Sequence, residues 1–172
     1  MTTLLFDVEG NNFYPQVDTI WCIAILADGD DAPSVYADAP GYEPLAVGLE
    51  RLSKADKLVA HNGRGYDYWA INKLYPGTIR FEQMIDTLTL ARMRDPEGRH
   101  SLAVLGEALG FEKGDHTDFS RFSDEMATYC KQDVIVLDVL WKSLKPFYKK
   151  YTEAVACEHR VAYVLAKQTH HG

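Results

Sequence analysis

The sequence contains few cysteines and no long apolar run. Its three cysteines among 172 residues, Cys22, Cys130 and Cys157, are far apart and lie in apolar or helical patterns. This spacing argues against a disulfide framework or a zinc site with closely paired cysteines, and it is typical of a reducing cytoplasm. No run approaches the roughly 18 to 20 apolar residues that span a bilayer, and the N-terminus lacks the charged-then-apolar plan of a signal peptide. We therefore expect a soluble cytoplasmic protein with no membrane partner.

A surplus of basic residues is also missing. Lys and Arg total 18 against 25 Asp and Glu, which gives a net charge of −7 at pH 7. This charge argues against a broad basic face that holds long nucleic acid, because such binding neutralises many phosphates. Any nucleic-acid contact must be local, and the exception to expect is a nuclease whose acidic cluster is neutralised by bound metal. The hydrophobic content of 47% is enough for the core of one domain.

The order of the predicted elements indicates an α/β domain with a mixed sheet. Short apolar runs bounded by turn residues predict strands, and apolar residues at helical spacing predict helices. The expected strands are residues 3–8, 19–27, 33–36, 57–60 and 81–85. The expected helices are residues 45–52, 66–75, 87–93, 101–109, 124–148 and a last one that begins near residue 152. Strands early, alternation in the middle and helices late favour this class.

Four acidic residues lie where such a sheet would bring them together. Asp7 and Glu9 are two positions apart at the end of a strand, so both side chains point to the same face. Asp67 follows the fourth predicted strand across a short loop, and Asp133 lies inside the long late helix, one turn after Tyr129. Hard ions such as Mg²⁺ or Mn²⁺ prefer oxygen ligands, and two of them can flank a phosphate. Four carboxylates can hold two ions.

Each of these acids alone also fits a structural role. Asp7 and Glu9 in isolation fit a surface pair equally well, and Asp67 in isolation fits a helix N-terminal acid that stabilises the helix dipole. Asp95 and Glu97 have the same spacing as the first pair, but they lie in a turn-like, charged stretch that we expect to be a solvated loop. The joint order of the four acids is what favours a site.

That order resembles the DEDD exonucleases, which proofread for DNA polymerases and include several RNA-trimming enzymes. The three motifs of that family are similar to residues 5–9, 61–67 and 129–133. The tyrosine four positions before the last aspartate resembles the DEDDy branch. The similarity is closer still to the exonuclease domain of bacteriophage family A DNA polymerases, at residues 7–11, 61–63, 85–88 and 125–134. The resemblance covers nearly the whole chain and implies a ribonuclease H-like fold, a mixed β-sheet flanked by helices.

The resemblance implies a role for each matched residue. The implied ligands of two divalent ions, Mg²⁺ or Mn²⁺, are Asp7, Glu9, Asp67 and Asp133. Tyr129 would help to orient the attacking water. A phenol with a pKa near ~10 is a poor base at neutral pH, so its hydroxyl should act by hydrogen bonding while the metal lowers the pKa of the water. The alternative for Tyr129 is a buried aromatic on the helix face.

Residues beside the motifs are expected to contact the substrate or to support the site. The expected substrate contacts are Asn11, His61, Asn62 and Tyr66. His61 and Asn62 either brace the site and contact the terminal nucleotide or satisfy backbone groups of their loop. Arg64 is expected to be a solvated surface charge. Asp86 precedes a predicted helix, and we expect an N-cap there rather than a fifth ligand.

The resemblance implies a metal-dependent exonuclease that removes nucleotides from single-stranded or frayed DNA 3′ ends. It would proofread as a domain or split subunit of a phage-type DNA polymerase, in the cytoplasm of a bacterial host. An exoribonuclease that trims short RNA is the alternative. An inactive binding module is more remote, because a scaffold needs no cluster of mutually repelling acids. We expect an exonuclease domain at residues 1–151 and a helix resembling the connection to a polymerase domain at 152–172, with packing on its own domain as the alternative.

Overall fold

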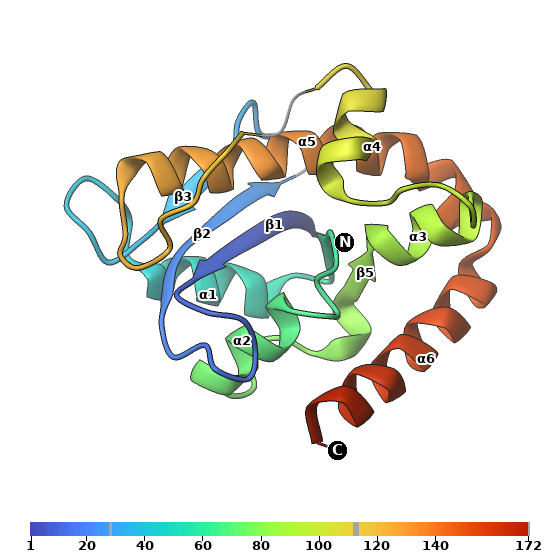
Figure 1. The fold of residues 1–172 in the computed structure, drawn as a ribbon, viewed down its shortest axis with the longest axis horizontal. Coiled ribbons are helices and arrows are strands. Elements are labelled where there is room, and N and C mark those ends of the chain that lie inside the picture. The colour runs from blue at the N-terminus through green and yellow to red at the C-terminus, as the bar shows by residue number, and fades with distance from the viewer. Residues whose placement is uncertain (28, 112–113, 172) are drawn as a thin grey trace.

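A five-stranded mixed β-sheet lies between two layers of helices in the computed structural model, which describes residues 1–27, 29–111 and 114–171 (Figure 1). The strand order is β3-β2-β1-β4-β5. The strands are β1 (Thr3–Gly10), β2 (Ile20–Ala27), β3 (Ser34–Tyr36), β4 (Lys57–Ala60) and β5 (Met84–Asp86). β1 pairs antiparallel with β2, whereas β1, β4 and β5 run parallel to one another. The mixed α/β sheet predicted from the sequence is confirmed.

Alternating side chains of β1 contribute to two hydrophobic clusters, one on each face of the sheet. The helices are α1 (Leu45–Lys54), α2 (Asp67–Leu74), α3 (Thr87–Arg94), α4 (Leu102–Ala108), α5 (Asp124–Lys150) and α6 (Thr152–His171). Leu4 and Phe6 pack in the cluster that includes α1 and α2, while Leu5 packs in the cluster built mainly from α5. Successive strand residues point to opposite faces, so Asp7 and Glu9 lie on the α5 face with Leu5.

The predicted strand at residues 81–85 is shorter than expected and begins later. Residues 81–83 form a short 3₁₀ helix, η1 (Phe81–Gln83), before β5 begins at Met84. The side chain of Gln83 accepts a hydrogen bond from the backbone amide of Arg80 at 2.7 Å and donates to the carbonyl oxygen of Ala55. One of these bonds is local and the other reaches a distant segment, and together they hold the turn ahead of the strand, which the apolar pattern alone did not indicate.

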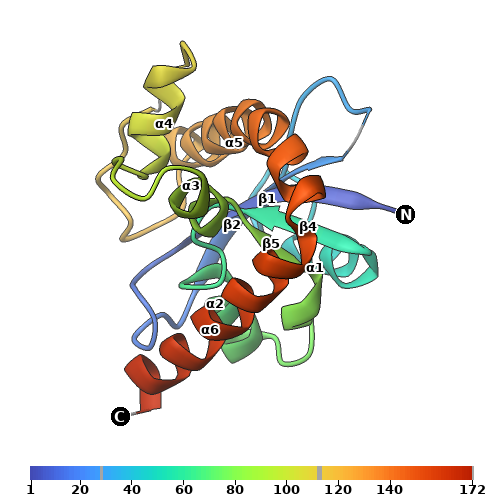
Figure 2. The ribbon, with the colours of Figure 1, turned by 90° about the vertical axis from the view of Figure 1, so that its right-hand side faces the viewer.

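α6 crosses the β5 side of the sheet, and its C-terminal end points away from it (Figures 1 and 2). One side of α6 is buried, with Val155 at 0% and His159 at 5% exposure. Its opposite side carries Val161, which is 47% exposed. Gly172, at the end of the predicted C-terminal segment, lies outside the described residues. Among the helices of the described part of the chain, none has the length and apolar content to cross a membrane.

Candidate active site

The parallel strands bring three of the four predicted acids, together with Asp86, to one edge of the sheet. Because β1, β4 and β5 run in the same direction, their carboxyl ends lie together. Asp7 and Glu9 lie near the carboxyl end of β1, and β5 ends with Asp86. The loop after β4 leads to Asp67, the first residue of α2, which is 4% exposed.

α5 brings the fourth acid over this edge. Asp133 is 3% exposed on the side of α5 that carries Met126, Val134 and Leu137 into the core. Asp133 and Asp7 line the same cavity of about 430 Å³. The sequence-predicted acids therefore gather at one place, from β1, the start of α2 and the middle of α5.

Burial and neighbouring charge raise the pKa of two of these acids, Glu9 and Asp67. Burial, followed by the charge of Asp7, raises the pKa of Glu9 to about 10, and Asp133 adds to this repulsion. Burial and the charge of Asp7 likewise raise the pKa of Asp67 well above its usual range, although the backbone amides of Asp67 and Val8 act in the opposite direction. Buried like charges of this kind destabilise the ionised cluster unless a cation neutralises it.

The donor set fits a hard divalent ion. One ligand atom each from Asp7, Glu9 and Cys130 lies within 4.8 Å of the others. The carboxylate oxygens suit Mg²⁺ or Mn²⁺. Burial raises the pKa of the Cys130 thiol well above its usual range, and this thiol points at the carboxylate of Asp7, with Sγ 3.7 Å from Oδ2. A protonated thiol is a poor ligand for such ions, so we assign the ligand role to the carboxylates.

Cys130 is a site neighbour that the sequence reasoning missed. Its pattern indicated an apolar helix position, and the residue is indeed 0% exposed. Its spacing of three residues from Asp133 on α5 was the available signal, because positions i and i+3 of a helix share a face.

Both ring nitrogens of His61 are engaged by the protein. Nδ1 lies 3.0 Å from the hydroxyl of Thr87, and Nε2 lies 2.9 Å from the carbonyl oxygen of His100. His61 therefore ties the end of β4 to the start of α3 and to the loop before α4. It also lines the cavity that contains Asp7 and Asp133.

Asp86 is the N-cap of α3, as predicted. Its carboxylate accepts a hydrogen bond from the backbone amide of Leu88 at 2.9 Å. The same carboxylate accepts bonds from the backbone amides of Asn62 and Arg64, both at 3.0 Å. These amides belong to the loop before Asp67, so Asp86 fixes that loop against β5. Asn62 adopts a left-handed conformation there, with φ 61°.

Asn11 holds the loop between β1 and β2. Its amide nitrogen donates to Asp18 at 2.6 Å, and its amide oxygen accepts from the backbone amides of Asp18 and Thr19 at 3.1 and 3.2 Å. Asn11 also lines a cavity beside Glu9. Its predicted contact with substrate stays a prediction.

Tyr66 closes the other side of that cavity. Its hydroxyl donates to the carbonyl oxygen of Asn12 at 3.0 Å. A Cβ at Gly10 would lie 2.7 Å from this hydroxyl, so glycine is what allows Tyr66 to reach the end of β1. The cavity measures about 280 Å³ and is lined by Glu9, Gly10, Asn11, Asn12, Phe13, Tyr66 and Phe119. Phe13 at its mouth is 81% exposed.

Tyr129 is half-buried on α5 under the segment that precedes this helix. Its ring lies 5.8 Å from the ring of His116 and 6.3 Å, edge to face, from that of Phe119. The indole nitrogen of Trp21 on β2 donates to the carbonyl oxygen of Phe119 at 3.0 Å, which ties the segment to the sheet. The water-orienting role of Tyr129 stays a prediction.

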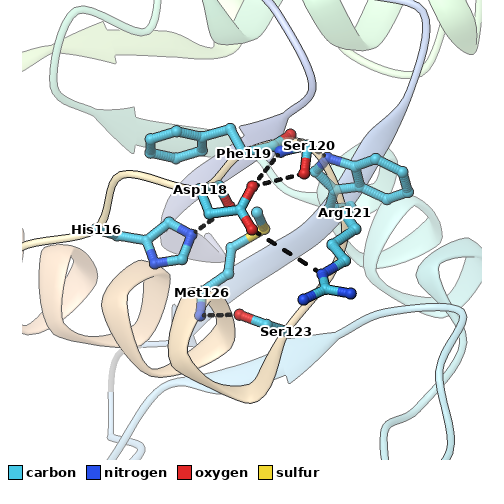
Figure 3. A network of polar contacts seen from close by, with 8 residues as sticks. His116, Asp118, Phe119, Ser120, Arg121, Ser123 and Met126 are labelled. Atoms are coloured by element: carbon cyan, nitrogen blue, oxygen red, sulfur yellow. Dashed lines mark hydrogen bonds and ion pairs between the residues drawn. The ribbon is translucent and has the colours of Figure 1, made fainter.

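The segment over Tyr129 is ordered by its own polar contacts (Figure 3). The carboxylate of Asp118 accepts hydrogen bonds from the amide and hydroxyl of Ser120 at 3.1 and 2.6 Å, and Arg121 lies 4.0 Å from it. His116 contacts the carbonyl oxygen of Asp118 at 2.7 Å. Ser123 then caps α5. Sequence reasoning missed this segment, because it has no helical or strand pattern.

The prediction that Arg64 is a solvated surface charge is wrong. Its side chain is 5% exposed, and the guanidinium carbon lies 3.7 Å from the centre of the Phe81 ring. It donates to the carbonyl oxygens of Met84 and, at 3.4 Å, His159. Burial lowers the pKa of Arg64 to about 10. The prediction failed because α6 packs over this loop, whereas the polar local sequence indicated an exposed position.

Proteins of known type resemble this chain in sequence and in fold. The DNA-directed DNA polymerase of Enterobacteria phage T3 is 27% identical over 230 aligned positions, which cover 98% of this chain and 33% of the polymerase. The chain thus spans about a third of that relative's length. Brucella melitensis NrnC, solved with bound Mg²⁺, has a TM-score of 0.72 at 19% identity, covering 96% of this chain and 84% of NrnC. Escherichia coli RNase D, an exoribonuclease involved in structured RNA processing, has a TM-score of 0.70 at 18% identity, and the match covers 96% of this chain and 45% of RNase D.

These likenesses agree with the fold expected from the motifs. The structural neighbours have low identity and support the fold alone. A family model described as the RNase_H superfamily matches residues 4–123, which include Asp7, Glu9 and Asp67 and make up more than half of the chain. The chain therefore belongs to the RNase_H superfamily.

Proposed function

We propose that this chain is a metal-dependent 3′→5′ exonuclease of the DEDDy type that removes nucleotides from single-stranded or frayed DNA ends in a bacterial host's cytoplasm. The observation that carries the proposal is the gathering of Asp7, Glu9, Asp67 and Asp133 at one sheet edge, with the pKa of Glu9 raised to about 10 by burial and by its acidic neighbours. A cluster that repels itself in this way is chemically useful when it holds cations.

The four carboxylates would hold two divalent ions, which supply an activated water and neutralise charge on the phosphate. Asp7 and Glu9 are fixed by β1, Asp67 by the start of α2, and Asp133 by α5. Tyr129 would donate a hydrogen bond that orients the water, since a phenol is protonated at neutral pH. Burial of these side chains keeps their positions fixed before substrate arrives.

The two cavities beside the acids would hold different parts of a strand end. The cavity next to Glu9 presents the rings of Phe13, Tyr66 and Phe119, on which a terminal base can stack. Stacking contributes roughly 1 to 3 kcal/mol per base. The cavity next to Asp7 and Asp133 also presents Arg92, a cation suited to a backbone phosphate. This arrangement explains how an acidic protein could contact nucleic acid locally.

DNA is the proposed substrate because the similarity in sequence runs along 98% of the chain to a DNA polymerase. An exoribonuclease is the second candidate, because Escherichia coli RNase D, an exoribonuclease by description, shares the fold at a TM-score of 0.70. Both functions would use the same carboxylates. They differ in how the terminal pocket treats the 2′-hydroxyl.

A digestion series distinguishes these functions. DNA and RNA oligonucleotides of one sequence, labelled at the 5′ end and carrying free or blocked 3′ ends, are incubated with Mg²⁺, Mn²⁺ or a chelator. The proposal predicts a ladder that shortens from free DNA 3′ ends only when metal is present. Faster digestion of RNA than of DNA would favour the exoribonuclease over the proposed DNA exonuclease. If neither nucleic acid is digested, both exonuclease hypotheses fail and the inactive binding module is the remaining interpretation.

We also propose that a polymerase domain or subunit docks on the outer side of α6. Val161, Val164 and Leu165 are 47%, 54% and 56% exposed there and, with Cys157, line a shallow apolar cavity. Val155 and His159 on the inner side are buried, so trimming the chain after Tyr151 would damage this protein itself. The division between residues 1–151 and 152–172 therefore stays a prediction.

A light-scattering titration with the matching polymerase polypeptide tests the docking proposal. Lysine substitutions at Val164 and Leu165 should abolish the complex. The control is Val47→Lys on α1, a valine that is 36% exposed and lies away from α6, which should leave the complex intact. Equal binding by all variants would contradict the proposed surface.

A further inference from the structure

His159 on the buried side of α6 contacts Asp86 and Arg64, which flank the candidate active site, through its side chain and its backbone. Its Nε2 accepts a hydrogen bond from the backbone amide of Asp86 at 3.3 Å. Its carbonyl oxygen accepts from Nη1 of Arg64 at 3.4 Å, a residue 95 positions earlier. Burial and the charge of Arg64 lower the pKa of His159 to about 3, so the ring is neutral and its proton lies on Nδ1. His159 therefore acts here as a hydrogen-bond acceptor.

Asp86 links His159 to the loop before Asp67 by hydrogen bonds on both sides. Its backbone amide is bound by His159, and its carboxylate accepts the backbone amides of Asn62 and Arg64 at 3.0 Å each. These two amides lie within the loop that ends at Asp67. Displacing Asp86 from α6 would therefore move the acceptor that holds this loop.

A second contact joins α6 to the same loop. The indole nitrogen of Trp69 donates to the carbonyl oxygen of Arg64 at 2.9 Å. The ring of Trp69 stacks on Tyr163 of α6, with centroids 5.8 Å apart and an interplanar angle of 8°. Tyr163 lies one turn after His159, so the next turn of α6 reaches the backbone of Arg64 through Trp69.

We propose that His159 is a positioning residue for the candidate nuclease site: through Asp86 it holds the loop that carries Asp67. The proposal rests on the proposed function, and it adds that α6 works with the exonuclease site rather than only connecting it to another domain. A displacement of about 1 Å at a reacting centre can cost on the order of a hundredfold in rate. Loss of the His159 acceptor should act in this way, through Asp67.

Matched variants separate positioning from simple core packing. His159→Leu has a similar size and cannot accept a hydrogen bond, whereas His159→Gln can offer its Oε1 to the amide of Asp86. Val155→Ala is the control, because Val155 is 0% exposed on the same side of α6, one turn before His159. Its truncation should lower the melting temperature without touching the loop.

The readouts are the affinity for Mn²⁺, followed by the electron paramagnetic resonance signal of the free ion, and kcat and KM on single-stranded DNA. Each variant is measured below its melting temperature, with the fold checked by circular dichroism. We expect His159→Leu to lower kcat by about 10- to 100-fold and to weaken Mn²⁺ binding. KM for DNA should change little, and His159→Gln should restore most of the loss. Val155→Ala should keep both kcat and Mn²⁺ affinity.

The proposal fails if His159→Leu changes only the melting temperature, as Val155→Ala should. If His159→Leu does not fold, Tyr163→Leu provides the second test, because Tyr163 is only half-buried and its loss removes the α6 ring that stacks on Trp69. Unchanged Mn²⁺ affinity in that variant would also overturn the proposal. Mn²⁺ affinity is independent of digestion, so a protein that binds the ion through this loop but digests no 3′ end would refute the proposed function and leave the positioning role standing.

Discussion

Glu9 should make the metal-free protein less stable as pH rises from 7 to 9. Burial and the charges of Asp7 and Asp133 raise its pKa to about 10 in the folded state, from an ordinary value of 4.5. The folded state therefore keeps a proton that the unfolded state has lost. This stabilising contribution is complete below pH 4.5 and disappears as pH rises toward 10. His159 has the opposite sign, but it acts only below about pH 6.5, the ordinary pKa of histidine.

The expected size follows from one bound proton. Each pH unit in this window should lower the free energy of unfolding by at most about 1.4 kcal/mol, or about 3 kcal/mol over the two units. For a domain of this length, such a change lowers the melting temperature by about 6 to 12 °C. Divalent metal should cancel the effect, because it stabilises the ionised carboxylates.

The assay is thermal unfolding followed by circular dichroism at pH 7, 8 and 9, with a chelator and with Mg²⁺ or Mn²⁺. Glu9→Gln, which cannot ionise, should flatten the pH dependence and raise the melting temperature of the metal-free protein at pH 9. In that variant the melting temperature should still fall with pH, but less steeply, because burial and Asp7 also raise the pKa of Asp67. An equal slope in the parent and in Glu9→Gln would refute the electrostatic account.

Three further predictions concern activity. Replacing Asp7 and Glu9 together by alanine should reduce digestion on the order of a thousandfold or more and keep the circular dichroism spectrum; near-parental digestion would contradict the ligand assignment. Tyr129→Phe should slow single-turnover digestion, but less than the double variant does. A rate equal to that of the parent would show that the Tyr129 hydroxyl has no role in catalysis. Phe13→Ala should raise KM for single-stranded DNA by roughly 5- to 100-fold, the equivalent of one stacked base, without changing the melting temperature, because Phe13 is 81% exposed. An unchanged KM would remove Phe13 from the substrate site.

Local periodicity was enough to predict the positions of the acids. The two-residue spacing of Asp7 and Glu9 gave a shared face once the strand was recognised, and the helical pattern placed Asp133 inside the long late helix, which is α5 in the structure. Strands that run parallel then bring their carboxyl ends to one edge, which explains why Asp7 and Glu9 lie near the loop before Asp67.

Contacts between distant segments could not be predicted in the same way. Arg64 lies in a polar loop, and it is buried because Phe81 and α6 pack against it in the fold. The 3₁₀ turn before β5 depends on Gln83 reaching Ala55, 28 positions away. No local pattern encodes such pairings, because each needs the fold to exist first.

The central claim is that these carboxylates support metal-dependent removal of nucleotides from a 3′ end. It is tested most directly by identifying the first product released from a single-stranded DNA that carries one labelled nucleotide at its 3′ terminus. With Mg²⁺, the account predicts that the labelled 5′-mononucleotide appears first, and that a chelator or the combined Asp7→Ala and Glu9→Ala replacement prevents it. Release from the 5′ end, internal fragments, or undiminished release by the double variant would contradict the account.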